Sequence, residues 1–394
     1  IPVPSYYVFP ESMFDRDKGI NTAEAEFPAY YNYFIQKKVV KFVATKDQEE
    51  RIRRVFQQTL LGPKESDIRK EISATCPIHL IPDFHKEASA LRTFHQVDDL
   101  FHFIHFSQQQ DHTNIAHLGD GVVIKHKPGG DFIVLEDGVE VERAPSKAPL
   151  PSDLWQTPVL ADKEPFDPPQ FGVTILGSGH GFDPRQRTAG FVLWINKRGI
   201  MVDPPLNSRG ILQMNGVPSR LIDSMIITHC HADHDSGALQ KLLEETQISF
   251  ITTPLILTSF LKKYSALTGL SEDYIRRLFV FRPAIIGEPF GIHGGEIRFF
   301  YSIHTIPCIG FEVYYGGKSM FYSGDTCYDP NLIQSMKDRQ LIPPERADFW
   351  INFKWHHNLI LHEAGVPPIH TPVAVLSALP EDVKTRVYLV HTSQ

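Results

Sequence analysis

The sequence predicts an α+β protein in which two mainly β layers are covered by helices on both outer faces. From residue 171 onward, short apolar runs typical of buried strands, such as 173–176, alternate with segments of helical periodicity. Near the C-terminal end, strands expected at 349–353 and 386–390 surround a helix expected at 372–379. Histidine and aspartate follow several of the apolar runs, so the polar chemistry is expected at the ends of strands.

The chain of 394 residues is long enough for two domains, because a single core usually stops growing near about 250 to 300 residues. We expect a mixed α/β accessory domain over 1–143, a proline-rich linker or strap over 144–170, and the catalytic domain over 171–394. The accessory domain opens with helical spacing over 47–61. It closes on an antiparallel meander of three short strands joined by glycine-containing turns, at 121–125, 131–135 and 139–142.

Composition is that of an ordinary globular protein, with 42% hydrophobic and 22% charged residues. No apolar run approaches the roughly 18 residues that cross a bilayer, so we expect a soluble protein without a membrane partner. The four cysteines have no paired spacing and are interpreted as reduced thiols of a cytoplasmic protein. A net charge of −7 argues against extended nucleic acid and favours a small substrate. A homodimer is left open.

The segment behind the apolar run 225–227 carries the densest metal-binding signal, with His229, His231, Asp233 and His234. In an extended loop His229 and His231 point the same way, so both can bind one ion. Asp233 and His234 are then free to turn toward a second ion. Imidazole and carboxylate suit zinc and similar ions. Packed or solvated histidines are the alternative, but packing explains poorly three histidines and a carboxylate directly behind a strand.

Three later residues repeat this placement. His304, Asp325 and His391 each follow an apolar run that is typical of a strand, as His229 does. Four repeats are poorly explained by chance. Another predicted strand ends on Asp203.

In this order, the residues resemble those of the metallo-β-lactamase fold superfamily, and the resemblance covers residues 171–394. It implies a four-layer αββα sandwich with two divalent metal ions at one edge, zinc first, with manganese or iron as alternatives. It assigns His229, His231 and His304 to the first metal, Asp233, His234 and His391 to the second, and Asp325 to both. It also implies that Asp203 orients the ligands without binding metal.

Within the superfamily the chain is most similar to the RNase Z and phosphodiesterase branch, through motifs at 176–179, 324–326 and 362–364. The last motif implies that His362 lies beside the scissile phosphate as a proton donor or transition-state stabiliser, with Glu363 or a nearby carbonyl fixing its tautomer. Asp233, His362 and Glu363 are therefore the catalytic candidates. A packed histidine at a strand end is the alternative for His362. We interpret His370 as an ordinary loop histidine.

The expected function is a metal-dependent phosphodiesterase that hydrolyses a cyclic nucleotide or another small nucleotide with a hydroxide activated by two metals. The alternatives are an RNase Z-like nuclease, a hydrolase of another ester class, and a non-catalytic nucleotide-binding regulator. RNase Z enzymes often carry a tRNA-gripping arm between the third histidine ligand and the bridging aspartate. Here those positions, His304 and Asp325, are only 21 residues apart, which argues against tRNA processing.

Overall fold

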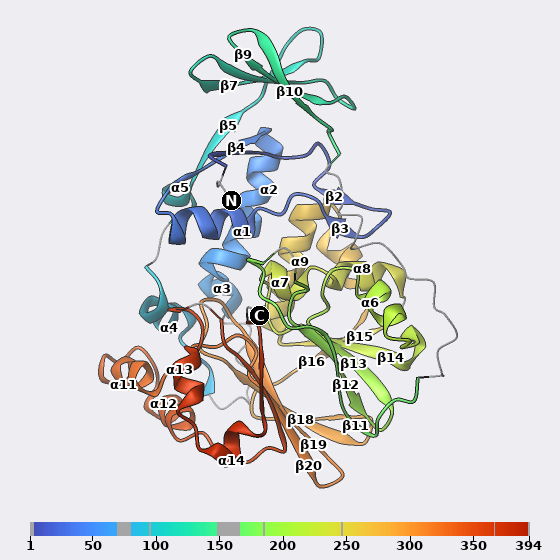
Figure 1. The fold of residues 1–394 in the computed structure, drawn as a ribbon, viewed down its shortest axis with the longest axis vertical. Coiled ribbons are helices and arrows are strands. Elements are labelled where there is room, and N and C mark those ends of the chain that lie inside the picture. The colour runs from blue at the N-terminus through green and yellow to red at the C-terminus, as the bar shows by residue number, and fades with distance from the viewer. Residues whose placement is uncertain are drawn as a thin grey trace.

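The computed structural model describes residues 4–68, 80–93, 96–147, 166–183, 186–245, 247–365 and 367–392, without the side chain of Phe34. Most of the stretch predicted as a linker or strap, 144–170, lies outside these residues. Figure 1 shows two large sheets with helices around them and the N-terminal part at one end. Within the described ranges, no helix combines the length and the apolar character that crossing a membrane requires.

Two six-stranded sheets occupy the part of the chain after residue 170. The first sheet consists, in spatial order, of β11 (Phe171–Gly177), β12 (Gly190–Ile195), β13 (Arg198–Val202), β14 (Ile222–Ile226), β15 (Ser249–Thr252) and β16 (Val280–Pro283). The second consists of β17 (Pro289–Ile292), β18 (Gly295–Tyr301), β19 (Ile309–Tyr315), β20 (Lys318–Tyr322), β21 (Leu359–Glu363) and β22 (Val387–Val390). Strands β13 to β16 are parallel to one another, as are β20 to β22, whereas β12 and β19 are antiparallel to β13 and β20.

Side chains along β12 show how the layers are built. All six residues of this strand are buried, because both faces of the sheet are covered. Leu193 belongs to the cluster that also contains Phe311 of the second sheet, so this face packs between the sheets. Trp194 points the other way and packs in the cluster that contains Ile211 of a helix. One face of the sheet therefore meets the other sheet and the opposite face meets a helix.

Helices complete the four-layer αββα sandwich that the sequence predicts. Those of the first half are α6 (Ser208–Met214), α7 (Ala232–Asp235), α8 (Ala238–Glu244), α9 (Pro254–Thr268) and α10 (Glu272–Arg276). Those of the second half are α11 (Pro330–Asp338), α12 (Pro344–Ile351), α13 (Val373–Ser377) and α14 (Glu381–Lys384). Met336 and Trp350 of α11 and α12 pack with Phe321 of β20, on the outer face of the second sheet.

One predicted element is wrong. The strand expected at 349–353 is the end of helix α12 and the residues that follow it. A short apolar run cannot be assigned to strand or helix by periodicity alone, and Pro343 and Pro344 mark a helix start here. The helix expected at 372–379 and the strand expected at 386–390 correspond to α13 and β22.

The N-terminal part contains two sheets and several short helices. Its parallel sheet consists of β1 (Tyr6–Val8), β4 (Val40–Ala44) and β5 (Phe101–His105), and a small hairpin pairs β2 (Phe14–Asp15) with β3 (Ile20–Asn21). The helices are α1 (Glu26–Tyr30), α2 (Lys46–Phe56), α3 (Glu65–Ile68), α4 (Phe84–Leu91) and α5 (Val97–Leu100), with π-helical turns η1 (Tyr31–Ile35) and η2 (Gln57–Leu61). A capping box between Thr45 and Gln48 explains where α2 begins.

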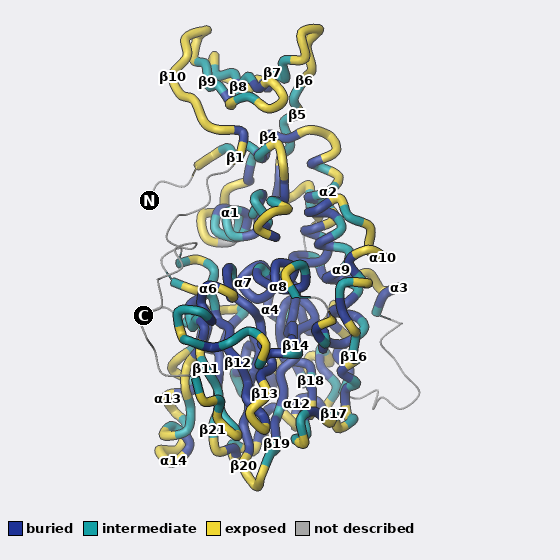
Figure 2. The backbone as a smooth tube through the Cα atoms, turned by 90° about the vertical axis from the view of Figure 1, so that its right-hand side faces the viewer, coloured by how far each residue is buried: buried dark blue, intermediate teal, exposed yellow. Residues whose placement is uncertain are grey.

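The predicted meander is part of an antiparallel sheet of five strands, β6 (Ser107–Gln108), β7 (Asn114–Gly119), β8 (Val122–His126), β9 (Phe132–Glu136) and β10 (Val139–Ala144). This sheet stands apart from the two large sheets in both views, and Figure 2 shows many exposed residues on it. Strand β4 and helix α2 pack firmly on the large sandwich: Phe42 and Phe56 share one buried cluster with Phe250 of the first large sheet and Phe260 of α9.

Candidate metal centre

The fold brings the predicted ligands together at one edge of the sandwich. Strands β14, β20 and β22 end directly before or within a few residues of His229, Asp325 and His391. In open α/β sheets, ligands bind outside the carboxyl ends of the strands, and these three strands end at the same site. Each of the seven predicted ligands is at most 8% exposed.

The first group of ligand atoms comes from His229, His231, His304 and Asp325. The Nδ1 atom of His231 lies 3.0 Å from Nε2 of His229 and 3.2 Å from Nε2 of His304. The carboxylate atom Oδ2 of Asp325 lies 3.7 Å from the same Nε2 of His229. Three ring nitrogens that converge on one point, with a carboxylate beside them, form a suitable donor set for a divalent cation.

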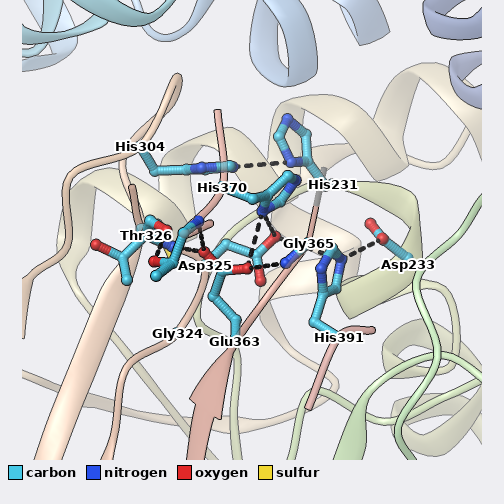
Figure 3. Close-up of polar contacts among 12 residues, drawn as sticks. His231, Asp233, His304, Gly324, Asp325, Thr326, Glu363, Gly365, His370 and His391 are labelled. Atoms are coloured by element: carbon cyan, nitrogen blue, oxygen red, sulfur yellow. Dashed lines mark hydrogen bonds and ion pairs between the residues drawn. The ribbon is translucent and has the colours of Figure 1, made fainter. Parts of the chain in front are cut away.

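The second group consists of Asp233, His234 and His391. The Nε2 atom of His391 lies 2.9 Å from Oδ2 of Asp233 (Figure 3). Asp325 faces this group too, with Oδ1 at 3.2 Å from Nε2 of His234 and Oδ2 at 3.5 Å from Nε2 of His391. The Asp325 carboxylate therefore lies between the two groups, as expected of a bridging ligand.

Unsatisfied buried atoms test whether these residues fit a metal. Among the described residues, Nε2 of His234 and Oδ1 of Asp325 are buried, and apart from the 3.2 Å approach to each other they have no hydrogen-bond partner. Buried polar atoms are normally satisfied, so such atoms require an explanation. Imidazole nitrogens and carboxylate oxygens suit borderline divalent ions. The residues present fit divalent metal.

Electrostatics favours the metal-binding protonation states of the first group and of Asp325. Burial lowers the pKa of His231 to about 3 and holds the pKa values of His229 and His304 well below their usual range, so these rings are neutral. Burial alone would raise the pKa of Asp325, but the neighbouring His234 and His391 rings hold it well below its usual value. Neutral imidazole and ionised carboxylate are the forms that coordinate metals. Burial alone would lower the pKa of His234, but the charges of Asp325 and Asp233 raise it well above its usual value.

Asp203 contacts the predicted ligand His234 and also Thr228, the residue before His229. Its carboxylate accepts hydrogen bonds from the backbone N–H of Thr228 at 2.8 Å and from the Thr228 hydroxyl at 2.6 Å. It also lies 3.0 Å from Nδ1 of His234, so Nε2 of that ring is left to face the ligand group. The orienting role that the resemblance implies for Asp203 stays a prediction, and these contacts are the ones through which it would act.

Glu363 and His362 lie on different sides of β21. Glu363 accepts from the backbone N–H groups of Thr326 and Thr371, beside Asp325. His362 instead packs among aromatic rings, with its centroid 5.7 Å from that of Trp355, and its Nδ1–H donates to the Glu363 carbonyl at 2.7 Å. The structure thus brings Glu363 to the ligand groups and leaves His362 among the aromatic rings.

His370 lies beside the ligand groups, where the sequence analysis expected His362. Its Nδ1 atom lies 3.2 Å from Oε2 of Glu363 and 3.8 Å from Oδ2 of Asp325 (Figure 3). Its ring centroid is 4.7 Å from that of His391. No apolar strand run precedes His370, so the signal that located the other histidines did not mark it. The sequence interpretation of His370 as an ordinary loop histidine is wrong.

The two packed sheets, the outer helices and the buried histidine and aspartate groups at the strand ends form the arrangement that the sequence predicted from its resemblance to the metallo-β-lactamase fold. More specifically, the chain belongs to the family described as Anti-Pycsar protein Apyc1, whose model matches residues 171–394.

Relatives extend the similarity over the whole chain. It is 45% identical to the cGMP-dependent 3′,5′-cGMP phosphodiesterase A of Dictyostelium discoideum, in an alignment that covers 100% of this chain and 59% of that protein. It is 30% identical to the cAMP/cGMP-dependent 3′,5′-cAMP/cGMP phosphodiesterase B of the same organism, over 98% of this chain and 40% of that protein. The chain thus spans about half the length of these relatives. A crystal structure of the metallo-β-lactamase fold protein YhfI from Bacillus subtilis aligns with a TM-score of 0.42 and 16% identity, covering 56% of this chain and 85% of that one.

Proposed function

We propose that this chain is a metal-dependent phosphodiesterase that hydrolyses a 3′,5′-cyclic nucleotide, with cGMP as the first substrate to test. The observation that carries the proposal is the pair of adjoining ligand groups joined by Asp325, with the His370–Glu363 pair directly beside them. The 45% identity to a relative named as a cGMP phosphodiesterase supports the choice of substrate. A small cyclic nucleotide is also compatible with the net charge of −7, which disfavours long polyanions.

The proposed cofactor is a pair of divalent ions, with zinc as the first choice because five of the six non-bridging ligands in the two groups are imidazoles and the sixth, Asp233, is a carboxylate. His229, His231 and His304 would hold one ion, and Asp233, His234 and His391 the other, with Asp325 shared. When bound, such a pair lowers the pKa of water, so that a hydroxide is available near neutral pH, and polarises a phosphoryl oxygen. The chain's part is to hold these ligands in fixed protonation states.

His370 is the proposed proton donor to the leaving oxygen. Its Nδ1 faces the Glu363 carboxylate at 3.2 Å, which leaves Nε2 for the substrate. Burial alone would lower its pKa, but the charge and hydrogen bond of Glu363 raise the pKa of His370 to about 9. The ring therefore carries a proton at neutral pH, and an expelled alkoxide can take that proton from Nε2. Glu363 holds the ring in place, and it is itself fixed by three backbone N–H groups, those of Thr326, Gly365 and Thr371.

The direct test is a comparison of substrate classes with the purified chain. Zinc, manganese and metal-free forms are each incubated with 3′,5′-cGMP, 3′,5′-cAMP, bis(p-nitrophenyl) phosphate, a tRNA precursor and a β-lactam. We expect metal-dependent opening of a cyclic nucleotide to a nucleoside monophosphate, at a higher kcat/KM than for any other class. Turnover of the tRNA precursor or the β-lactam without turnover of either cyclic nucleotide would contradict the proposal.

A further inference from the structure

A main-chain carbonyl of the N-terminal part contacts the loop from Cys230 to Asp235, which is called the ligand loop below. The Nε2–H of His231 donates to the carbonyl oxygen of Thr59, in η2, at 2.9 Å. The same carbonyl accepts from the Tyr30 hydroxyl at 3.2 Å. A histidine that donates through Nε2 carries its lone pair on Nδ1, and Nδ1 is the atom of His231 that faces His229 and His304. A residue far from the ligands in sequence thus fixes the tautomer of one of them.

A second contact holds the backbone of the ligand loop. The carboxylate atom Oε2 of Glu26, in α1, accepts from the N–H of Ala232 at 3.1 Å. Its Oε1 atom lies 2.8 Å from Nζ of Lys263, which also donates to the carbonyl of Cys230 at 2.8 Å and to Asp235 at 2.9 Å. Glu26 and Lys263 are at most 2% exposed. Together they hold the loop from both sides of His231.

Other contacts between the same two parts of the chain do not touch the ligands. Arg51 of α2 donates to the carbonyls of Ala266 and Leu267 at the end of α9, both at 2.6 Å. This contact joins the N-terminal part to the large sandwich as the Glu26 contact does. Its removal therefore shows how much zinc affinity depends on the association of the two parts in general. Any larger effect of removing Glu26 is then specific to the ligand loop.

We propose that the N-terminal part is a positioning element of the metal centre, acting through the Thr59 carbonyl on His231 and through the Glu26 carboxylate on the loop from Cys230 to Asp235. The inference rests on the metal binding that the proposed function requires. Partners of metal-bound histidines keep the rings in the orientation and tautomer that coordinate, and their removal typically costs about 10- to 100-fold in metal affinity. Glu26 and Thr59 are positioning residues, because neither faces the point where the ligand nitrogens converge.

The test compares three variants of the full chain, Glu26→Ala, Glu26→Gln and the control Arg51→Ala. Zinc affinity is measured by competition with a chromophoric chelator, and cobalt(II) absorption reports the geometry of the ligands. Thermal unfolding of the metal-free proteins shows how much each variant loses in folding alone. We expect Glu26→Ala to bind zinc at least about tenfold more weakly than Arg51→Ala. Glu26→Gln, which keeps an oxygen for the Ala232 N–H, is expected to fall between Glu26→Ala and the unaltered chain.

Equal zinc affinities in folded Glu26→Ala and Arg51→Ala would overturn the inference, whatever their common value. If Glu26→Ala does not fold, the zinc affinity of Glu26→Gln is the test. A zinc affinity at least about threefold lower than that of Arg51→Ala supports the positioning role, and a smaller difference overturns it. Failure of the unaltered chain to bind zinc, cobalt or manganese is a separate result, because it would remove the proposed metal centre itself.

Discussion

At the residue scale, His362 and Glu363 are neighbours on a strand, so their side chains leave it on opposite faces. Glu363 meets His370, whereas His362 meets Trp355. We therefore predict that His370→Ala lowers kcat for a cyclic nucleotide by about 10²- to 10⁴-fold, the usual range for losing a general acid. His362→Phe, which keeps a ring in the aromatic packing, is expected to leave kcat near that of the unaltered enzyme.

Steady-state kinetics with cGMP and with a substrate that has a good leaving group measures this difference. An activated p-nitrophenyl ester needs little protonation of its leaving oxygen, so His370→Ala should lose much less rate on it. The assignment would be refuted by a large loss of kcat in His362→Phe with normal turnover in His370→Ala.

Asp203 supports a second residue-scale prediction. Its carboxylate is fully buried and faces both Thr228 and Nδ1 of His234. Asp203→Asn keeps the size of the side chain but removes the charge that stabilises a proton on Nδ1 of His234. We expect metal affinity to fall by about 10- to 100-fold. Isothermal titration with zinc measures the loss, and an unaltered dissociation constant would rule out an orienting role.

The sequence predicted most of the site because the ligands obey a local rule. His229, Asp325 and His391 each follow an apolar strand, and a strand end can be read from a few neighbouring residues. His370 has no such strand before it, and it reaches the site through the loop after β21. Side chains alternate between the two faces of a strand, so His362 and Glu363, as neighbours on β21, could not both face the metal ligands. The Thr59 carbonyl lies 172 positions from His231, and no local pattern reports a contact of that separation.

At the element scale, the turn after β20 requires glycine. Gly324 has a φ of +58°, and an added Cβ would lie 2.5 Å from the carbonyl oxygen of Ile309. Gly317, in the hairpin before β20, has a φ of +75° but nothing within 4 Å of its Cβ position. Gly317→Ala thus isolates the cost of a left-handed alanine, about 1 kcal/mol.

We predict that Gly324→Ala costs about 3 kcal/mol, because overpacking adds to the backbone strain. It should also weaken metal binding, since Asp325 is the next residue. Urea unfolding of both metal-free variants gives the two free energies, and zinc titration gives the affinities. Equal losses in Gly317→Ala and Gly324→Ala, with equal zinc affinity, would show that this turn does not position Asp325.

Most helices and strands could be predicted from the spacing of apolar residues and from the residues that begin and end helices. Helix α9 begins after Thr253, with Pro254 at its first position, and ends at Gly269 in the left-handed region, all signals that the sequence displays. The strand prediction at 349–353 was wrong because four apolar residues in a run of five fit either a strand or the end of a helix. Short elements depend on what packs against them, and here Trp350 packs against the ring of Phe300.

At the scale of the whole molecule, the N-terminal helices and the large sandwich share one buried core. Phe42 of β4 and Phe56 of α2 belong to the same cluster as Phe250 and Phe260. The five-stranded sheet packs instead in a small cluster, in which its residues Ala116, Ile124 and Phe132 meet Val43 of β4. Parts with a common core unfold together, whereas a sheet with few buried apolar contacts opens at lower free energy.

Metal binding should therefore slow hydrogen exchange to different extents in different parts of the chain. A ligand that binds only the folded state at 100 times its dissociation constant adds about 2.7 kcal/mol to the free energy of unfolding. We predict that this gain appears equally in hydrogen exchange of β4 and of β13, because both exchange through opening of the shared core, and is smaller in β8 and β9. Exchange measured by mass spectrometry with zinc and with a chelator tests this. If zinc raised the protection of β13 and left β4 unchanged, the N-terminal helices would be an independent unit, and Glu26 and Thr59 would not be coupled to the metal ligands.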